Sequence, residues 1–240
     1  MIPAGLRDHW CSWLGASDEQ VATLGEPAPG ASVPDVVVVG SARRAEPGWD
    51  GEIHPLVGIV DPSGRAVLSV APEREGQARQ LVDGMKSLDS VRVAMPALLG
   101  LENSWVYQAT YRWSIAPARV EELPDLGRWV PVTDPRLPLW LHPFGGKALV
   151  AFEQGDGTYL AGVGLKRHDS HVSEIAVGTD DRARGRGLAR RLVAQAAREL
   201  LSAGVIPTYL HDPSNVPSAR VAVAAGFPDR GWTALGVTGR

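Results

Sequence analysis

The chain is poor in cysteine, in lysine and in long hydrophobic runs. Cys11 is its only cysteine among 240 residues, which excludes an internal disulfide and a cysteine-rich zinc site. It lies between Trp10 and Trp13, where a small buried hydrophobe is a simpler interpretation than a nucleophile. No run of 18 or more apolar residues occurs, and residues 1–15 lack a basic segment followed by an apolar one. We therefore expect a cytoplasmic protein that neither spans nor binds a membrane.

The charge balance gives little reason to expect a nucleic-acid partner. The formal net charge is −3, and 21 of the 24 basic residues are arginine. Several of these arginines cluster within residues 182–191, but the cluster is local and matches the size of a phosphate group rather than that of a polynucleotide.

The clearest motif is a glycine-bearing loop between a predicted strand, residues 172–177, and a predicted helix, residues 188–202. A nucleoside-triphosphate loop is absent, and the dinucleotide fingerprint fails because position 190 is arginine. What remains is Arg-x-x-Gly-x-Gly, at Arg182, Gly185 and Gly187. Glycines let the backbone turn and approach a ligand, and the first N–H groups of a helix have no intrahelical partner. The loop therefore predicts a diphosphate site.

A second motif follows in the order that one protein family uses. Gly204 ends the predicted helix, a short strand is predicted over residues 208–211, and Asn215 then stands eleven residues before the pair Gly226-Phe227. Over residues 145–233 this combination resembles the acyl-CoA motifs of the GNAT superfamily, the Gcn5-related N-acetyltransferases. The Ser-Ala-Arg-Val segment at 218–221 is most similar to the glycine N-acyltransferase-like branch.

This resemblance implies an α/β fold with a mixed sheet, the GNAT fold in the C-terminal half, and acetyl-CoA as co-substrate. The strands at 171–177 and 207–211 would splay apart around the thioester, and the N–H near Val177 would polarise its carbonyl. We expect main-chain N–H groups of residues 184–189 to matter more than any one arginine side chain. The residues that the resemblance places around CoA are Ala176, Val177, Arg182, Arg184, Gly185, Arg186, Gly187, Leu188, Ala189, Asn215 and Ser218.

The reaction chemistry is less sharply indicated. Glu174, His171 and His211 are the candidates for a general base. The family often has a tyrosine seven residues after the asparagine as the proton donor to the departing thiolate, but this chain has Ala222 there. Four alternatives remain: another proton donor such as Tyr209, a water molecule as donor, release of the sulfur as thiolate, or an absence of catalysis. Asn215 is expected to cap the last helix, to bind the pantetheine arm, or to do both.

Two regions are predicted, residues 1–122 and 123–240. The first is a smaller α/β region with strands at 35–39, 55–60, 65–70, 91–95 and 104–114, a helix at 74–86, and a loop at 25–34 after a short N-terminal helix. It is interpreted as either a degenerate GNAT-like copy or a simple shielding wall, and we expect no CoA site in it because it lacks a glycine loop.

The second region opens with a proline-rich stretch, residues 123–144, in which Trp140, His142 and Phe144 are candidate acceptor contacts; simple packing is the alternative. A hairpin at 147–152 and 160–166 and a last strand at 232–237 complete the region, and a strand of the first half or of a partner copy is expected to extend the sheet. A homodimer is compatible with this arrangement.

The function that these motifs favour is transfer of an acetyl or other short acyl group from CoA to a primary amine of a small molecule or peptide. The amine would attack directly in a ternary complex, without a metal. The alternative is a catalytically silent acyl-CoA-binding regulatory module, which Ala222 motivates. RNA binding through the arginines is disfavoured by the negative net charge. The motifs select neither the acceptor nor the acyl length.

Overall fold

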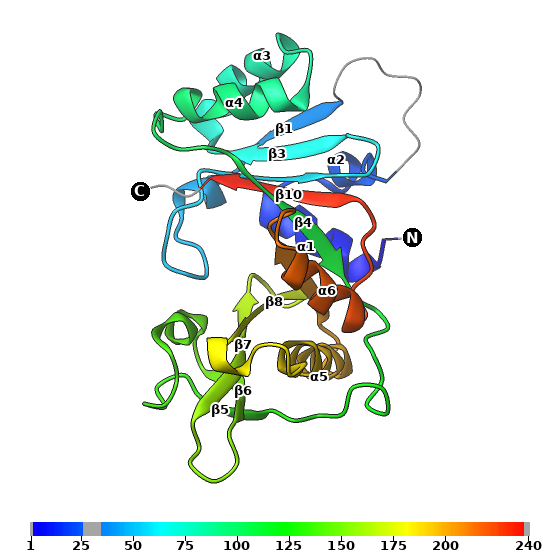
Figure 1. Ribbon diagram of the computed structural model, residues 1–240. Helices are drawn as coiled ribbons and strands as arrows, with labels where there is room; N and C mark the ends of the chain where they lie inside the picture. Colours follow the sequence, from blue (N-terminus) through cyan, green and yellow to red (C-terminus); the bar gives the residue numbers. More distant parts are fainter. Residues whose placement is uncertain (1, 26–34, 238–240) are drawn as a thin grey trace. The chain divides into compact units, whose positions relative to one another are not determined.

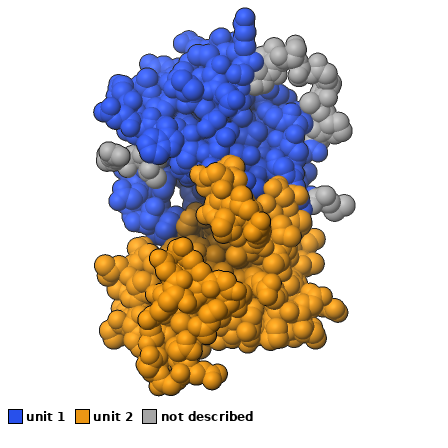
Figure 2. Space-filling model, in the orientation of Figure 1, with its two compact units in different colours: residues 1–111, 230–240 blue, residues 112–229 orange. Residues whose placement is uncertain are grey.

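A computed structural model describes residues 2–25 and 35–237 (Figure 1), so the loop predicted at 25–34 lies outside the described residues except for Gly25. The contacts divide the chain into two compact units (Figure 2). Unit 1 is Met1–Tyr111 with Arg230–Arg240, and unit 2 is Arg112–Asp229. The predicted division at 122/123 differs from the observed units in two places. Residues 112–122 belong to unit 2, and the C-terminal segment that starts at Arg230 belongs to unit 1.

Unit 1 is an α/β unit whose strands follow the order β1-β3-β2-β10-β4. β1 and β3 pair in parallel, while β2 pairs antiparallel with β3 and β10, and β10 pairs antiparallel with β4. The last strand is therefore flanked by strands of the first half, which is one of the two arrangements expected. The elements are α1 (Ala4–Leu14), α2 (Asp18–Ala22), β1 (Val36–Gly40), β2 (Leu56–Val60), β3 (Ala66–Val70), α3 (Glu75–Asp83), α4 (Leu88–Leu98), β4 (Tyr107–Trp113) and β10 (Trp232–Val237).

The strand predicted at 91–95 is wrong, because these residues lie in the middle of α4. The Ser87 side chain caps this helix by accepting a hydrogen bond from the Ser90 N–H at 3.1 Å. Val91 and Met95, four residues apart, are buried, whereas Val93 between them is 83% exposed. The apolar spacing is that of a helix face rather than the alternation of a strand.

Unit 2 contains a five-stranded sheet in the order β9-β8-β7-β6-β5. β8 and β9 are parallel, and the other neighbours are antiparallel. The predicted hairpin, helix and following strand are confirmed, while the short strand β5 within the proline-rich stretch was not predicted. The elements are β5 (Arg128–Pro131), the 3₁₀ helix η3 (Leu139–Phe144), β6 (Lys147–Phe152), β7 (Tyr159–Arg167), β8 (Val172–Thr179), the 3₁₀ helix η4 (Asp181–Ala183), α5 (Leu188–Ser202), β9 (Ile206–His211) and α6 (Val216–Ala224).

Helix α5 fixes the position of the loop that precedes it. Leu192, Val193 and Ala196 are fully buried and share one apolar core with Val163 and Ile175 of the sheet. This stripe recurs every three to four residues, so it holds one face of the helix on the sheet. The N-terminus of α5 therefore lies beside the carboxyl end of β8.

Candidate functional site

The two parallel strands of unit 2 separate partway along their length. The ladder between β8 and β9 pairs Val172 with Ile206 and ends with Glu174 opposite Thr208. β8 continues to Thr179, paired only with β7 over this part. After Glu174, the main-chain groups of β8 on the edge towards β9 are therefore not paired with β9. This is the separation of the two strands that was predicted.

The loop between β8 and α5 presents main-chain donors. Asp180 shapes its first turn, since its Oδ1 accepts from the Arg182 N–H at 3.2 Å. Gly185 and Gly187 have φ angles of 78° and 73°, a region that side chains other than glycine rarely adopt. Within the described chain, no protein group accepts a hydrogen bond from the main-chain N–H of residues 185–187. These donors and the free N–H groups of the first helical turn together form a cradle for an anion.

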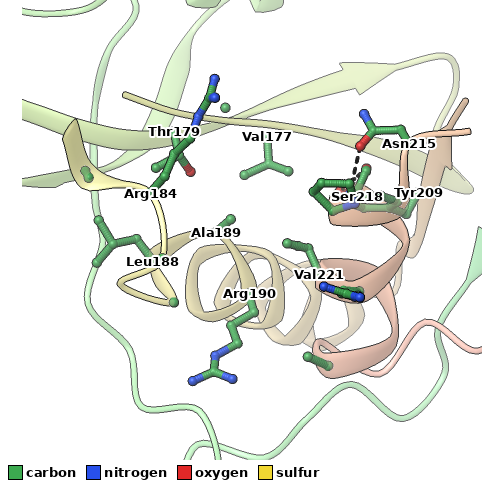
Figure 3. A pocket seen from close by; sticks show the side chains of 17 residues that line it. Val177, Thr179, Arg184, Leu188, Ala189, Arg190, Tyr209, Asn215, Ser218 and Val221 are labelled. Atoms are coloured by element: carbon green, nitrogen blue, oxygen red, sulfur yellow. Dashed lines mark hydrogen bonds between the residues drawn. The ribbon is translucent and has the colours of Figure 1, made fainter. Parts of the chain in front are cut away.

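A cavity of about 870 Å³ lies between this loop, the end of β8, β9 and α6. Figure 3 shows Leu188 and Ala189 on one side, Ser218, Tyr209 and Val221 on the other, and Val177 between them. The seventeen lining residues include three arginines and no acidic residue: Val177, Gly178, Thr179, Ala183, Arg184, Gly185, Gly187, Leu188, Ala189, Arg190, Tyr209, Asn215, Pro217, Ser218, Arg220, Val221 and Ala224.

Most residues predicted to surround CoA line this cavity. The exceptions are Ala176, Arg182 and Arg186. The Arg182 Nε lies 3.1 Å from Asp180 Oδ1, and the Arg186 Nη1 lies 3.0 Å from Glu153 Oε2. Both guanidinium groups are thus held at the rim of the loop by acidic neighbours.

The prediction overlooked two lining arginines. The Arg190 side chain folds back over the start of α5, so that a Cβ on Gly187 would lie 3.0 Å from the Arg190 Nε. Arg220 comes from α6. A helical projection shows where a side chain starts and not where four rotatable bonds take it, so spacing alone does not predict that Arg190 and Arg220 line the cavity.

The first turn of α6 lies on the opposite wall of the cavity. The Asn215 Oδ1 accepts from the Ser218 N–H at 3.0 Å, which confirms Asn215 as the cap of this helix. The Ser218 hydroxyl in turn lies 2.9 Å from the hydroxyl of Tyr209. Ala222 is fully buried in the core behind the cavity. The tyrosine hydroxyl at the cavity wall therefore comes from β9 and not from position 222 of α6.

The sequence matches the model of the acetyltransferase (GNAT) family over residues 107–227, just over half of the chain. The chain belongs to the GNAT family. The matched segment starts at the first residue of β4 and ends at Phe227, so it encloses the splayed strands, the glycine loop and the cavity. The comparison with curated proteins gave no match.

Several solved structures resemble this GNAT chain at low sequence identity. A putative acetyltransferase from Novosphingobium aromaticivorans is 20% identical, with 56% of this chain and 65% of that one covered and a TM-score of 0.44. A GNAT acetyltransferase from Colwellia psychrerythraea is 15% identical, with 75% and 80% covered and a TM-score of 0.46. A GNAT-like protein from Streptococcus suis is 16% identical, with 71% and 78% covered and a TM-score of 0.48.

The base candidate Glu174 is buried in an ion pair. Its Oε1 lies 2.5 Å from the Lys166 Nζ and its Oε2 lies 3.5 Å from the His168 Nε2. Burial alone would raise the pKa of this carboxyl group, but Lys166 and His168 outweigh burial and lower the pKa to about 2. A carboxylate with so low a pKa is a weak proton acceptor at neutral pH.

The two histidine candidates of this GNAT chain also lie outside the lining of the cavity. The His211 Nε2 accepts from the Arg112 Nε at 3.1 Å, and its Nδ1 lies 2.8 Å from the main-chain oxygen of Asp212. Because arginine can only donate, the Nε2 lone pair is occupied. His171 precedes β8 and is six residues from Val177, which corresponds to about 20 Å along a strand.

The candidate acceptor contacts lie on η3. The Trp140 ring covers Gly178 and the Phe144 ring covers Gly164, so closely that a Cβ on either glycine would overlap the ring. The two rings meet edge to face with centroids 5.8 Å apart, whereas His142 is exposed. Phe144 also lines a second cavity of about 580 Å³, and neither Trp140 nor His142 does.

No helix in residues 2–25 and 35–237 is long and apolar enough to cross a membrane. The same residues contain no group of three histidine, cysteine or acidic side chains placed to hold a metal ion.

Proposed function

We propose that this GNAT protein is an N-acyltransferase that moves an acetyl or other short acyl group from CoA to the primary amine of a small molecule or peptide. The observation that carries the proposal is the cavity in which a loop of free main-chain N–H groups, a splayed strand pair and a buried tyrosine hydroxyl meet. Each of these parts matches one chemical need of a thioester donor.

The residues present suit acyl-CoA. Gly185 has open space above it, since a Cβ there would meet no atom within 4 Å, so a diphosphate can approach the loop. Apolar side chains of Val177, Leu188 and Val221 line the cavity beyond the loop and suit the pantetheine arm. The main-chain N–H of Val177 on β8 would hydrogen-bond the thioester carbonyl and stabilise the oxyanion that forms on attack.

The proposed reaction is direct attack of the amine nitrogen on the thioester carbon. The C–S bond breaks as the amide forms, the amine loses its proton to solvent, and the sulfur receives one. We assign the second proton transfer to Tyr209, whose side chain is 2% exposed. Burial raises the pKa of this phenol despite the Ser218 hydrogen bond and the nearby Arg112 charge, so the hydroxyl stays protonated at neutral pH.

Within the described residues no carboxylate or imidazole lines the cavity. The amine is therefore proposed to arrive already deprotonated, and Glu174, His171 and His211 are given structural rather than basic roles. The acceptor would pass Trp140 and Phe144, whose rings cover the other face of β7 and β8; His142 is a less favoured contact because it is exposed.

The remaining features are also proposals, some from the resemblance and some from composition and charge. They are the glycine N-acyltransferase-like branch, a cytoplasmic location, a homodimer, and the absence of nucleic-acid and membrane partners. The same holds for the interpretation of residues 1–122 as a shielding region without CoA, and for a second domain over 123–240.

The alternative of a silent acyl-CoA-binding module rests on the buried Ala222, which occupies the place of the usual tyrosine. Release of thiol from acetyl-CoA, measured against a panel of amines, separates the two. An enzyme gives amine-dependent thiol release and a new amide detected by mass spectrometry. CoA binding without amine-dependent release from any acceptor would support the silent module.

A further inference from the structure

The second cavity, of about 580 Å³, lies at the other end of α5 from the glycine loop. Ala196, Leu200 and Ala203 line it from the last turns of α5 and its C-cap, whereas residues 188–190 of the same helix line the first cavity, beside the glycine loop. The two cavities have no lining residue in common. The second cavity is therefore separate from the proposed acyl-CoA site.

Much of the wall of the second cavity is apolar. Trp129 and Phe144 are its aromatic lining residues, and Leu200 adds an aliphatic side chain. Gly145 and Gly146 leave the wall open beside them, since a Cβ on either glycine would meet no atom within 4 Å. Within the described chain, no protein group accepts a hydrogen bond from the main-chain N–H of these two glycines. A cavity of this size and lining is typical of a site for a small organic molecule.

Lys147 and Arg167 bring two cationic side chains to this cavity from the neighbouring strands β6 and β7. The register pairs Leu149 with Val163, and both residues pack in the core beneath α5. Lys147 comes two residues before Leu149, and Arg167 comes four after Val163, so both lie on the same face of the sheet as that pair. By this register the two cations are diagonal neighbours, with Cβ atoms about 7–8 Å apart, and their long side chains can reach one anion between them.

The charges of the second cavity favour a monoanion. In the part of the chain that the structure describes, the side chains of Lys147 and Arg167 form no hydrogen bond or ion pair. Glu199 is the acidic lining residue, and its carboxylate already accepts from the Trp129 Nε1 at 2.5 Å and from the Gln195 Nε2 at 3.2 Å. The lining side chains thus carry two positive charges and one negative charge, and both positive charges are uncommitted.

We propose that the second cavity binds a small aromatic monocarboxylate. The carboxylate accepts charge-assisted hydrogen bonds from Lys147 and Arg167, and the ring packs against Trp129 and Phe144 as aromatic pairs do. A dianion such as a phosphate monoester suits the site less well, because the net charge of the lining is +1 and much of the wall is apolar. This inference does not depend on the proposed function, since the two cavities are separate.

Calorimetry with 3-phenylpropionate and with its neutral analogue 3-phenylpropionamide tests the assignment. The proteins compared are the wild type, Lys147→Gln, Arg167→Gln and the double variant. Two control variants each remove one positive charge elsewhere. Lys86→Gln changes an exposed lysine outside both cavities, and Arg190→Gln changes an arginine of the first cavity.

The wild type is expected to bind 3-phenylpropionate about 10- to 100-fold more tightly than the amide, the range of charge-assisted hydrogen bonds. Each single variant should reduce this preference. The double variant should lose it because the carboxylate binds more weakly, while the affinity for the amide stays within about twofold. Lys86→Gln and Arg190→Gln should keep the preference of the wild type.

Wild-type protein that binds 3-phenylpropionate no more tightly than the amide, or that binds neither compound, would overturn the inference. A preference that survives in the double variant would also overturn it. Loss of the preference in Arg190→Gln would place the carboxylate in the first cavity, and loss in Lys86→Gln would indicate a general effect of charge, so either result contradicts the assignment. None of these outcomes bears on the binding of CoA to the first cavity.

Discussion

The hydroxyl oxygens of Tyr209 and Ser218 lie 2.9 Å apart on the wall of the cavity. The tyrosine comes from β9 and directly follows Thr208, the last residue of β9 that pairs with β8. The serine comes from the first turn of α6. We propose that the phenol protonates the departing thiolate and that the serine hydroxyl orients the phenol.

Tyr209→Phe is expected to lower kcat about 100-fold, because general acid catalysis typically contributes that much, with little change in KM for acetyl-CoA. Steady-state kinetics and calorimetry with CoA measure the two effects. Tyr159→Phe is the control, since it removes a part-buried tyrosine hydroxyl that bonds the Gly178 oxygen at 3.2 Å and does not line the cavity. Unchanged kcat in Tyr209→Phe would show that the thiolate leaves without this proton donor.

Glu174→Gln is expected to act on stability rather than on the reaction. The wild-type carboxylate, with its pKa lowered from 4.5 to about 2, contributes stability at neutral pH that is lost as the pH falls from about 4.5 towards 2. The variant should unfold at pH 7 with a free energy about 2–3 kcal/mol lower, and the gap should narrow at pH 3. Denaturant titrations at both pH values measure this.

The pH dependence of kcat/KM provides the complementary test of Glu174. If the amine arrives deprotonated, the acidic limb should follow the pKa of the acceptor amine and should be the same in the wild type and in Glu174→Gln. Loss of that limb in a variant of normal stability would identify Glu174 as the base.

Arg112 is expected to be a centre of stability in unit 2. Its side chain is 4% exposed and donates to His211 Nε2, to the Phe227 oxygen at 3.1 Å and to Asp229 Oδ2 at 3.0 Å. Arg112→Gln leaves the buried His211 Nε2 and the Phe227 oxygen without this donor, so thermal and denaturant melts should show a loss of about 3 kcal/mol.

The matched control for Arg112 is Arg119→Gln. Arg119 is 75% exposed in its ion pair with Glu122, and exposed pairs contribute little, so this variant should change the unfolding free energy by less than about 0.5 kcal/mol. Similar melting behaviour of the two variants would contradict the structural role of Arg112.

Local patterns in the sequence predicted the elements of unit 2 well. The helix at 188–202, the turn at the loop glycines and the Asn215 cap rest on short-range signals, and each is confirmed. The failures have two physical causes. In α4, Val91 and Met95 have the four-residue spacing of a helix face and Ser87 is a helix cap, and both signals were overlooked. The pairing of β10 with β2 and β4 joins residues far apart in sequence, which local patterns do not encode, so the predicted division at 122/123 and the observed units differ.

The candidate site was predicted where main-chain geometry defines it and less well where side chains do. Val177, Gly185 and Gly187 line the cavity. Their positions follow from the main-chain path at the end of β8 and from the positive φ angles of the two glycines, which the sequence signals directly. Arg190 and Arg220 were overlooked because long side chains reach positions that spacing does not predict. The base candidates were chosen by residue type. Glu174 pairs with Lys166 of the neighbouring strand and His211 accepts from Arg112, and these partners are brought close only by folding.

The most direct test of the whole account is calorimetry of CoA binding to the double variant Gly185→Val and Gly187→Val. Valine disfavours φ values near 75°, so the cradle should open and affinity for CoA should fall at least tenfold. Gly100→Val is the control, because Gly100 also has a positive φ of 74° and open space around it but does not line the cavity. This control variant should bind CoA like the wild type. Wild-type protein that takes up no CoA, or a double variant that binds it with unchanged affinity while Gly100→Val does the same, would contradict the central claim.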